Sequence, residues 1–299
     1  MKTTTLIIIL LPLFISAQTT TPDVITSSGA YFSNTNGSLS WTLGELATET
    51  FSNGGNTLTQ GFQQPVSVSI TGVNLDLLVY LEGPFNGTEM NTDLTGLPDP
   101  VDGFPLSQPY NTSPWNYAGT ESVSSIPNSN VVDWVLIELR DAASASAALP
   151  ADIIGTQAAF LLKDGSVVGT DGSSILYYNV TVNHDLFVVI WHRNHLGVLS
   201  ANALSQTGGV FNYDFSSAVT QVYNGGAGYK EIATGKYGMV AGDANGSGEL
   251  NTSDHNLWKT NAGKKGYLSS DYDMDAQANN PDKNDYYIPN INYESQIPD

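Results

Sequence analysis

The sequence contains no cysteine and very little positive charge. The absence of Cys from 299 residues excludes disulfide bonds and thiol catalysis. Only 10 lysines and arginines accompany 29 acidic residues, which gives a formal net charge of −19 at pH 7. Such a chain is repelled by phosphate backbones and anionic lipids, so we expect no nucleic-acid or membrane-surface partner. Divalent cations are its natural counter-ions.

Long hydrophobic runs are also absent, since no stretch approaches the roughly 18 apolar residues of a membrane-spanning helix. The apolar run Leu6–Phe14 follows Lys2 and precedes a small-residue segment that ends at Ala17. This pattern predicts a signal peptide over residues 1–17, with cleavage near Ala17-Gln18. We therefore expect a secreted or cell-surface protein that does not insert into the membrane and whose net charge is −20 once Lys2, the only charged residue of the leader, is lost. The lack of disulfides favours a bacterial protein.

Charged residues make up only 13% of the chain, and long helical periodicity is absent. Short runs of Val, Ile, Tyr, Phe and Thr instead alternate with Asn-Gly, Gly-Gly and Asp-Gly turns, which is typical of a mainly β protein. The predicted organisation is an N-terminal β-meander over 18–66, an immunoglobulin-like β-sandwich over 67–238, and a small C-terminal module over 239–299.

In the N-terminal region, Asn36-Gly37 and Gly54-Gly55 divide the chain into three strand-like runs, which predicts a meander of about three strands. Its words SLSWTLGE and LTQGFQQP resemble a segment that recurs near the N-termini of exported Bacteroidota proteins of unassigned function. That resemblance indicates export from the cell and says nothing of a reaction.

The middle region shows five clear strand patterns. Residues 186–191 are apolar on both faces, so we expect a central strand covered on both sides. A two-sheet sandwich of the immunoglobulin-like type fits these runs best. The predicted strands are Leu75–Leu81, Val131–Arg140, Ala158–Lys163, Ile175–Val182 and Leu186–Trp191.

Two 12-residue segments near the C-terminus carry oxygen-bearing side chains at positions 1, 3, 5, 7, 9 and 12. Calcium takes about six to eight oxygen ligands, and a loop with this spacing supplies them. Two such loops in tandem predict two Ca²⁺ sites. In loop one (243–254) the residues are Asp243, Asn245, Ser247, Glu249, Asn251 and Asp254, and in loop two (271–282) they are Asp271, Asp273, Asp275, Gln277, Asn279 and Asp282.

The first of these segments, GDANGSGELNTSDHNLW, resembles the first repeat of the dockerin family, because Asp occupies position 12 where ordinary EF-hands have Glu. The resemblance implies a short helix over 253–262 and a cohesin-like protein partner. Two departures stand out: Ser247 replaces the usual Asp at position 5, and Ala276 replaces the Gly whose positive φ the turn needs. A calcium-stapled cap packed on the sandwich, with no cohesin partner, is an equal alternative.

Two polar motifs end apolar strands and raise the question of catalysis. His192 and His195 in WHRNH could approach one metal, or they could close the strand with turn hydrogen bonds. Glu138 and Arg140 share one face of a predicted strand. They could form an ion pair, or Glu138 could be a ligand-binding carboxylate or half of a glycosidase pair. Arg140 and Arg193 are the only two arginines, and both end strongly apolar strands. Their placement suggests a shared structural or binding role with Glu138 or Asp141.

An aromatic loop, GFPLSQPYNTSPWNYAGTE at 103–121, places Tyr110, Trp115 and Tyr117 among amide and hydroxyl side chains. Flat rings with amide neighbours suit the faces of sugars, although the same rings can anchor a long loop to the core.

Taken together, these patterns favour a non-catalytic calcium-binding protein with a role in adhesion, scaffolding or carbohydrate association. The alternatives are a glycan-acting hydrolase that carries a dockerin-like module, and a structural subunit of an assembly.

Overall fold

A computed structural model describes residues 28–34, 37–43, 50–53, 56–59, 70–97 and 103–299. The predicted signal peptide lies outside these residues. The chain divides into two compact units, Met1–Val66 and Ser67–Asp299. The residues of the predicted sandwich and of the predicted C-terminal module both belong to the second unit.

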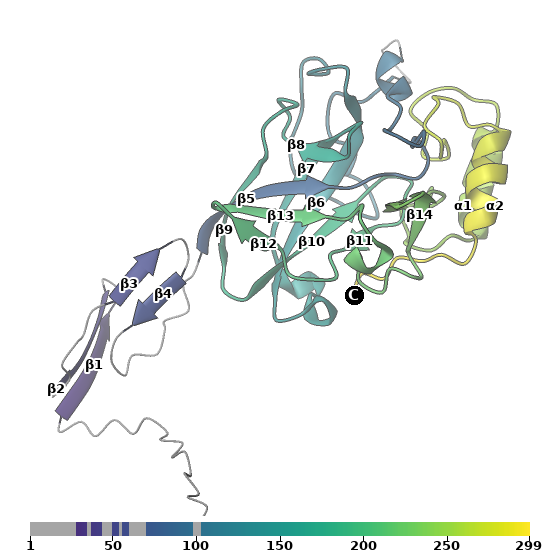
Figure 1. Ribbon diagram of the computed structural model, residues 1–299. Coiled ribbons are helices and arrows are strands. Elements are labelled where there is room, and N and C mark those ends of the chain that lie inside the picture. The colour runs from purple at the N-terminus through teal and green to yellow at the C-terminus, as the bar shows by residue number, and fades with distance from the viewer. Residues whose placement is uncertain (1–27, 35–36, 44–49, 54–55, 60–69, 98–102) are drawn as a thin grey trace, which may run out of the picture. The chain divides into compact units, whose positions relative to one another are not determined.

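The first unit contains two antiparallel hairpins (Figure 1). One pairs β1 (Ser28–Asn34) with β2 (Gly37–Leu43), and the other pairs β3 (Thr50–Asn53) with β4 (Asn56–Thr59). The sequence had suggested a three-stranded meander. The described residues form four strands in two separate pairs.

The second unit is built on one curled sheet of nine strands (Figure 1). Its order is β11-β10-β6-β7-β8-β5-β13-β12, and β9 also pairs with β5. Every neighbour is antiparallel except β13 on β5. A mainly β fold is therefore confirmed. The strands are β5 (Ile70–Leu78), β6 (Val131–Ala142), β7 (Ile153–Leu162), β8 (Ser166–Val168), β9 (Leu176–Val182), β10 (Asp185–Trp191), β11 (Val198–Leu199), β12 (Ser205–Thr207) and β13 (Val210–Asp214).

Strand β5 pairs with two successive strands along one of its edges. One edge of β5 pairs first with β9 and then with β8, and a bulge falls between Thr71 and Val73. Gly72, with φ of 83°, supplies the positive dihedral that such an irregularity requires. Because one strand serves two partners, the paired strands form a single curled path.

Strand β10 has two buried faces, as its sequence predicted. Leu186, Val188 and Ile190 belong to the main core, whereas Phe187 and Val189 belong to a second cluster on the opposite face. Alternate side chains of a strand point to opposite faces, so this single strand joins both cores.

The remaining elements are a hairpin, the C-terminal helices and several short 3₁₀ segments. The hairpin of β14 (Tyr229–Ala233) and β15 (Lys236–Met239) leads into α1 (Thr252–Asn261), a π-helical turn η5 (Asp282–Tyr287) and α2 (Ile288–Asn290). In Figure 1 these C-terminal segments run from green to yellow. Short 3₁₀ segments are η1 (Asp93–Gly96), η2 (Ala145–Ala147), η3 (Pro150–Asp152) and η4 (Val219–Gln221). No helix among the described residues is long and apolar enough to span a membrane.

Candidate functional site

The first acid of each 12-residue loop holds the middle of that loop. The Asp243 carboxylate accepts hydrogen bonds from the backbone N–H groups of positions 5 and 6 at 2.9 and 2.8 Å. The Asp271 carboxylate accepts from the same two positions of loop two at 3.1 and 3.0 Å. Position 1 therefore performs the same task in both loops.

The last acid of each loop closes it from the other side. Asp254 accepts from the N–H groups of positions 3 and 9 at 3.3 and 2.9 Å, and Asp282 accepts from the same positions at 3.1 and 2.6 Å. The side chain at position 3 also accepts from the N–H of position 5 in both loops, at 3.0 and 3.2 Å. The backbone N–H groups thus point inward to the acids, and each loop wraps around its own side-chain oxygens.

Both loops require positive φ at positions 4 and 6. Loop one meets this requirement with Gly246 at 68° and Gly248 at 83°. Loop two does so with Met274 at 60° and Ala276 at 74°, which is the conformation expected to strain Ala276. A non-glycine residue held there indicates that the surrounding contacts impose the loop shape.

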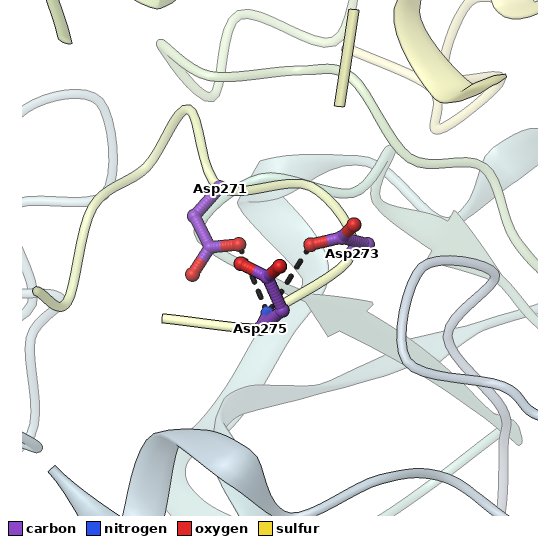
Figure 2. Close-up of side chains that lie close together, drawn as sticks. All are labelled: Asp271, Asp273 and Asp275. Atoms are coloured by element: carbon purple, nitrogen blue, oxygen red, sulfur yellow. Dashed lines mark hydrogen bonds between the residues drawn. The ribbon is translucent and has the colours of Figure 1, made fainter. Parts of the chain in front are cut away.

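Loop two brings three carboxylates together (Figure 2). One oxygen each from Asp271, Asp273 and Asp275 lies within 4.8 Å of the others, so this group could hold a metal ion. Asn279, at position 9, also has a buried Oδ1 that accepts no hydrogen bond among the described residues. An acceptor oxygen left without a donor beside three carboxylates suits a cation.

Burial disfavours the charged form of these acids. Asp243 is 2% exposed, while Asp254, Asp271 and Asp282 are 0% exposed. Burial raises the pKa of Asp243 to about 7, with the Gly248 N–H opposing the shift. Burial also raises the pKa of Asp271 to about 8, against the influence of Arg193. A bound divalent cation would remove this penalty, because it favours the ionised carboxylates.

The helix predicted after loop one is α1, and its start is capped by the loop itself. Asn251 Oδ1 accepts from the Ser253 N–H at 2.8 Å, while the Asp254 carboxylate accepts from the Asn251 N–H. This reciprocal pair is a capping box. Since Asp254 also occupies position 12, one carboxylate closes the loop and begins the helix.

The two loops are linked through aromatic side chains. Trp258 of α1 donates its Nε1–H to the Asn279 carbonyl at 2.7 Å, and Tyr272 of loop two donates its hydroxyl to the Asp254 carbonyl at 3.3 Å. Trp258, Tyr272 and Tyr287 form a small core with two alanines. The loops therefore form one packed unit around these rings.

Loop two lies directly on the end of the sheet. Asn194, just beyond β10, donates to the Asp271 carbonyl at 2.6 Å. At Gly83, just beyond β5, a Cβ atom would lie 1.7 Å from the Tyr272 carbonyl oxygen, so only glycine fits. Asn290 donates to the Glu82 carboxylate at 2.6 Å. The C-terminal segment is thus attached to the sheet by buried backbone contacts.

The structure brings both candidate histidines together at this attachment. His192 Nε2 lies 3.2 Å from Asp133 Oδ2, and its Nδ1 lies 3.0 Å from His195 Nδ1. The N–H of Gly83 donates to His195 Nε2, which fixes that nitrogen as an acceptor. Burial lowers the pKa of His192, and it lowers the pKa of His195 well below its ordinary value. Burial therefore favours the neutral form of both imidazoles.

Arg193 completes this network. Its Nε donates to Asp133 at 2.8 Å, and its Nη1 donates to the Leu268 carbonyl. Burial would raise the pKa of Asp133, but the Arg193 and His192 side chains hold it below its ordinary value. His192, Arg193 and His195 are 1%, 5% and 1% exposed. Of these three residues, Arg193 bonds to the segment that leads into loop two, while His192 and His195 bond to Asp133 and Gly83 beneath it.

The other candidate residues divide between the core and a cleft. Tyr110 is fully buried and donates its hydroxyl to the Trp134 carbonyl at 2.7 Å, so it anchors the aromatic loop. Trp115, Tyr117, Glu138 and Arg140 line a single cleft of about 490 Å³. Arg140 Nε donates to Glu138 Oε1 at 2.7 Å within it.

Several residues of these sites were missed by the sequence reasoning. Trp191 lines the cleft and Glu82, Gly83 and Asp133 hold the C-terminal segment, yet none belongs to a recognisable motif. The one available signal was an acid inside an apolar strand, Asp133 in VVDWVL. Buried acids are rare without a partner.

Comparisons with known proteins return no matching family model, no matching curated protein and no matching solved structure.

Proposed function

We propose that this chain is an exported, non-catalytic calcium-binding protein of the bacterial surface or surroundings. In this proposal residues 239–299 form a dockerin-like segment that two calcium ions staple onto an immunoglobulin-like β domain. One observation carries it: two loops that are identical only at positions 1, 9 and 12 share the same hydrogen bonds to the side chains at positions 1, 3 and 12. Adhesion, scaffolding or carbohydrate association is the corresponding role.

Calcium contributes folding energy in this proposal. Four buried carboxylates close the two loops, and burial raises the pKa of each one. An ion that binds only the folded chain stabilises it by mass action. The oxygen-rich loops and their flexible spacing suit Ca²⁺ better than the smaller Mg²⁺.

A cap fits the contacts better than a cohesin-docking module. In the dockerin resemblance, Thr252-Ser253 and Asn280-Pro281 would meet the partner, and all four side chains are exposed. However, loop one leads into a ten-residue helix, whereas loop two leads into a π-helical turn and the three-residue α2. The two repeats therefore present different surfaces. Loop two, unlike loop one, packs against the end of the sheet.

The glycan hydrolase remains the second candidate, and the cleft is the place where it would act. Glu138 is the candidate acid, but its Oε1 is paired with Arg140. The histidine cluster is fully buried and neutral, so it reaches no substrate. These features favour binding over catalysis.

Calorimetric titration of calcium into chelator-stripped protein tests the proposal. We expect two binding events, of which Asp243→Ala removes one and Asp271→Ala removes the other. Asp164→Ala, in an exposed turn outside both loops, is the control that should keep both events. Absence of any heat at millimolar calcium would reject the calcium function.

A further inference from the structure

A cleft beside loop one is lined by residues that the calcium proposal does not explain. Three aromatic rings, Trp115, Tyr117 and Trp191, line it together with Glu138 and Arg140. Its volume of about 490 Å³ falls in the usual range for small-ligand sites. The rings come from the aromatic loop and from the end of β10, which are far apart in the sequence.

Each of these rings is held in place by a glycine. A Cβ on Gly246 would lie 2.8 Å from the Trp115 ring, and one on Gly197 would lie 2.4 Å from the Trp191 ring. A Cβ on Gly119 would lie 2.2 Å from the Tyr117 ring. The rings therefore rest directly on backbone, and their positions are set before any ligand arrives. Such preorganisation lowers the entropy lost on binding.

The floor of the cleft offers a fixed hydrogen-bond acceptor. Glu138 is 8% exposed, and its Oε1 accepts from Arg140. Among the described residues, no donor reaches its second oxygen, Oε2. Arg140 is itself held by the carbonyls of Ala148 and Pro298 at 2.6 and 2.9 Å. A carboxylate oxygen that has no protein donor, on a side chain that lines a cleft, can accept a hydrogen bond from a ligand hydroxyl.

The charges that line the cleft disfavour an anionic ligand and are compatible with a neutral one. Arg140 offsets Glu138, and Asp299 adds an acidic group at the lining, so an anion is disfavoured. Asn116, Thr156 and Ser247 supply further amide and hydroxyl partners. Aromatic faces beside hydroxyl-binding groups match a sugar, which has C–H groups on one face and hydroxyls around its edge.

Loop one forms one wall of this cleft. Gly246 and Ser247 line it, and the Trp115 ring packs on Gly246. A second cleft of about 370 Å³ shares Trp191 and Ser247 with the first and is lined by Gly248 and Glu249 of the same loop. Loop one therefore borders both spaces, which together have room for more than one sugar unit.

We propose that this cleft binds a neutral oligosaccharide, and that calcium in loop one strengthens the binding by fixing the wall that supports Trp115. The second part rests on the proposed calcium function. Since coupling between two sites is reciprocal, the saccharide also strengthens calcium binding to loop one. Loop two does not line the cleft and takes no part.

Tryptophan fluorescence titration with cellohexaose, mannohexaose, xylohexaose and maltohexaose, each in calcium and in chelator, tests the proposal. At least one probe binds, and Trp115→Ala or Trp191→Ala weakens its binding about tenfold or more. Tyr177→Ala, which removes an exposed aromatic of β9 outside the cleft, is the matched control. Thermal melts establish that each variant is folded, and Glu138→Gln tests the acceptor while keeping the shape of the side chain.

A second comparison tests the coupling between calcium binding to loop one and saccharide binding to the cleft. Chelator, or Asp243→Asn, lowers saccharide affinity about fivefold or more, whereas Asp271→Asn changes it less than twofold. Equal affinity in calcium and chelator would overturn the coupling. If none of the four oligosaccharides binds at millimolar concentration, the saccharide site is overturned, even where calorimetry shows calcium binding. Binding of the cation choline in place of the saccharides would overturn it as well. If calcium fails and a saccharide binds, only the calcium function is lost.

Discussion

Loop one and loop two have the same hydrogen bonds but different surroundings. Loop one carries two aspartates and two turn glycines, and it borders an open cleft. Loop two carries four aspartates and no glycine, and it lies on the buried network of Asp133, Arg193 and Asn194. The comparison shows that the loop shape can be set in two ways: by flexible residues within it, or by rigid contacts beneath it.

Removal of calcium tests what the loops share, and it carries the largest expected effect. At free calcium about 1,000 times the dissociation constant, each site contributes about 4 kcal/mol to the free energy of unfolding. For a chain of this size, two sites raise the melting temperature by more than about 10 °C between chelator and calcium. Differential scanning calorimetry measures the shift. Identical melts in both conditions would contradict a stapling role.

Asp133→Asn tests the support of loop two. The substitution leaves the buried Arg193 guanidinium without its nearest counter-ion, which costs about 3–5 kcal/mol of stability. It should also weaken calcium binding to loop two and leave loop one unchanged. Chemical denaturation and calorimetric titration measure the two effects.

Glu89→Gln is the control for that variant, because the Lys163–Glu89 pair lies at the surface, with side chains 37% and 44% exposed. Solvent screens such a pair, so its loss costs about 1 kcal/mol or less. Equal costs for the two substitutions would show that the buried network does not support loop two.

Substituting Ala for Gly248 in loop one, or Gly for Ala276 in loop two, tests what sets the shape of each loop at position 6. We expect these substitutions to have the smallest effect on stability and calcium affinity. Gly248→Ala should destabilise loop one by about 1–2 kcal/mol, because Ala is unfavourable at positive φ and its Cβ would lie 3.2 Å from Ser295. Ala276→Gly should raise the calcium affinity of loop two by a factor of a few, since it removes strain. A loss of affinity in the second variant would mean that Ala276 is not strained.

Much of the fold and of both loops could be predicted because the signals are local. Alternation along β5 and the two apolar faces of β10 follow from the two-residue period of a strand. The loop hydrogen bonds join residues two to nine apart, so the spacing of Asp, Asn and Gly suffices to specify them. The α1 helix begins at Thr252, after the N-cap Asn251, for the same reason.

Only the tertiary structure shows which candidate site residues line the cleft and which are buried in the core. Tyr110, Trp115 and Tyr117 lie within eight residues, yet Tyr110 enters the core while the other two line the cleft. His192 and His195 lie within hydrogen-bond distance of each other, and the buried partner of His192 is Asp133, which is 59 residues away in the sequence. Sequence spacing does not indicate which side of a loop the sheet will cover.

The sequence by itself determined the oxygen spacing of the loops, the strand pattern and the acidic charge, because each depends on neighbouring residues. Only the tertiary structure decided what the loops touch. Glu82 meets Asn290 across 208 residues, and Gly83 meets the backbone of Tyr272. Such contacts depend on the order of strands in the curled sheet, which no local pattern encodes.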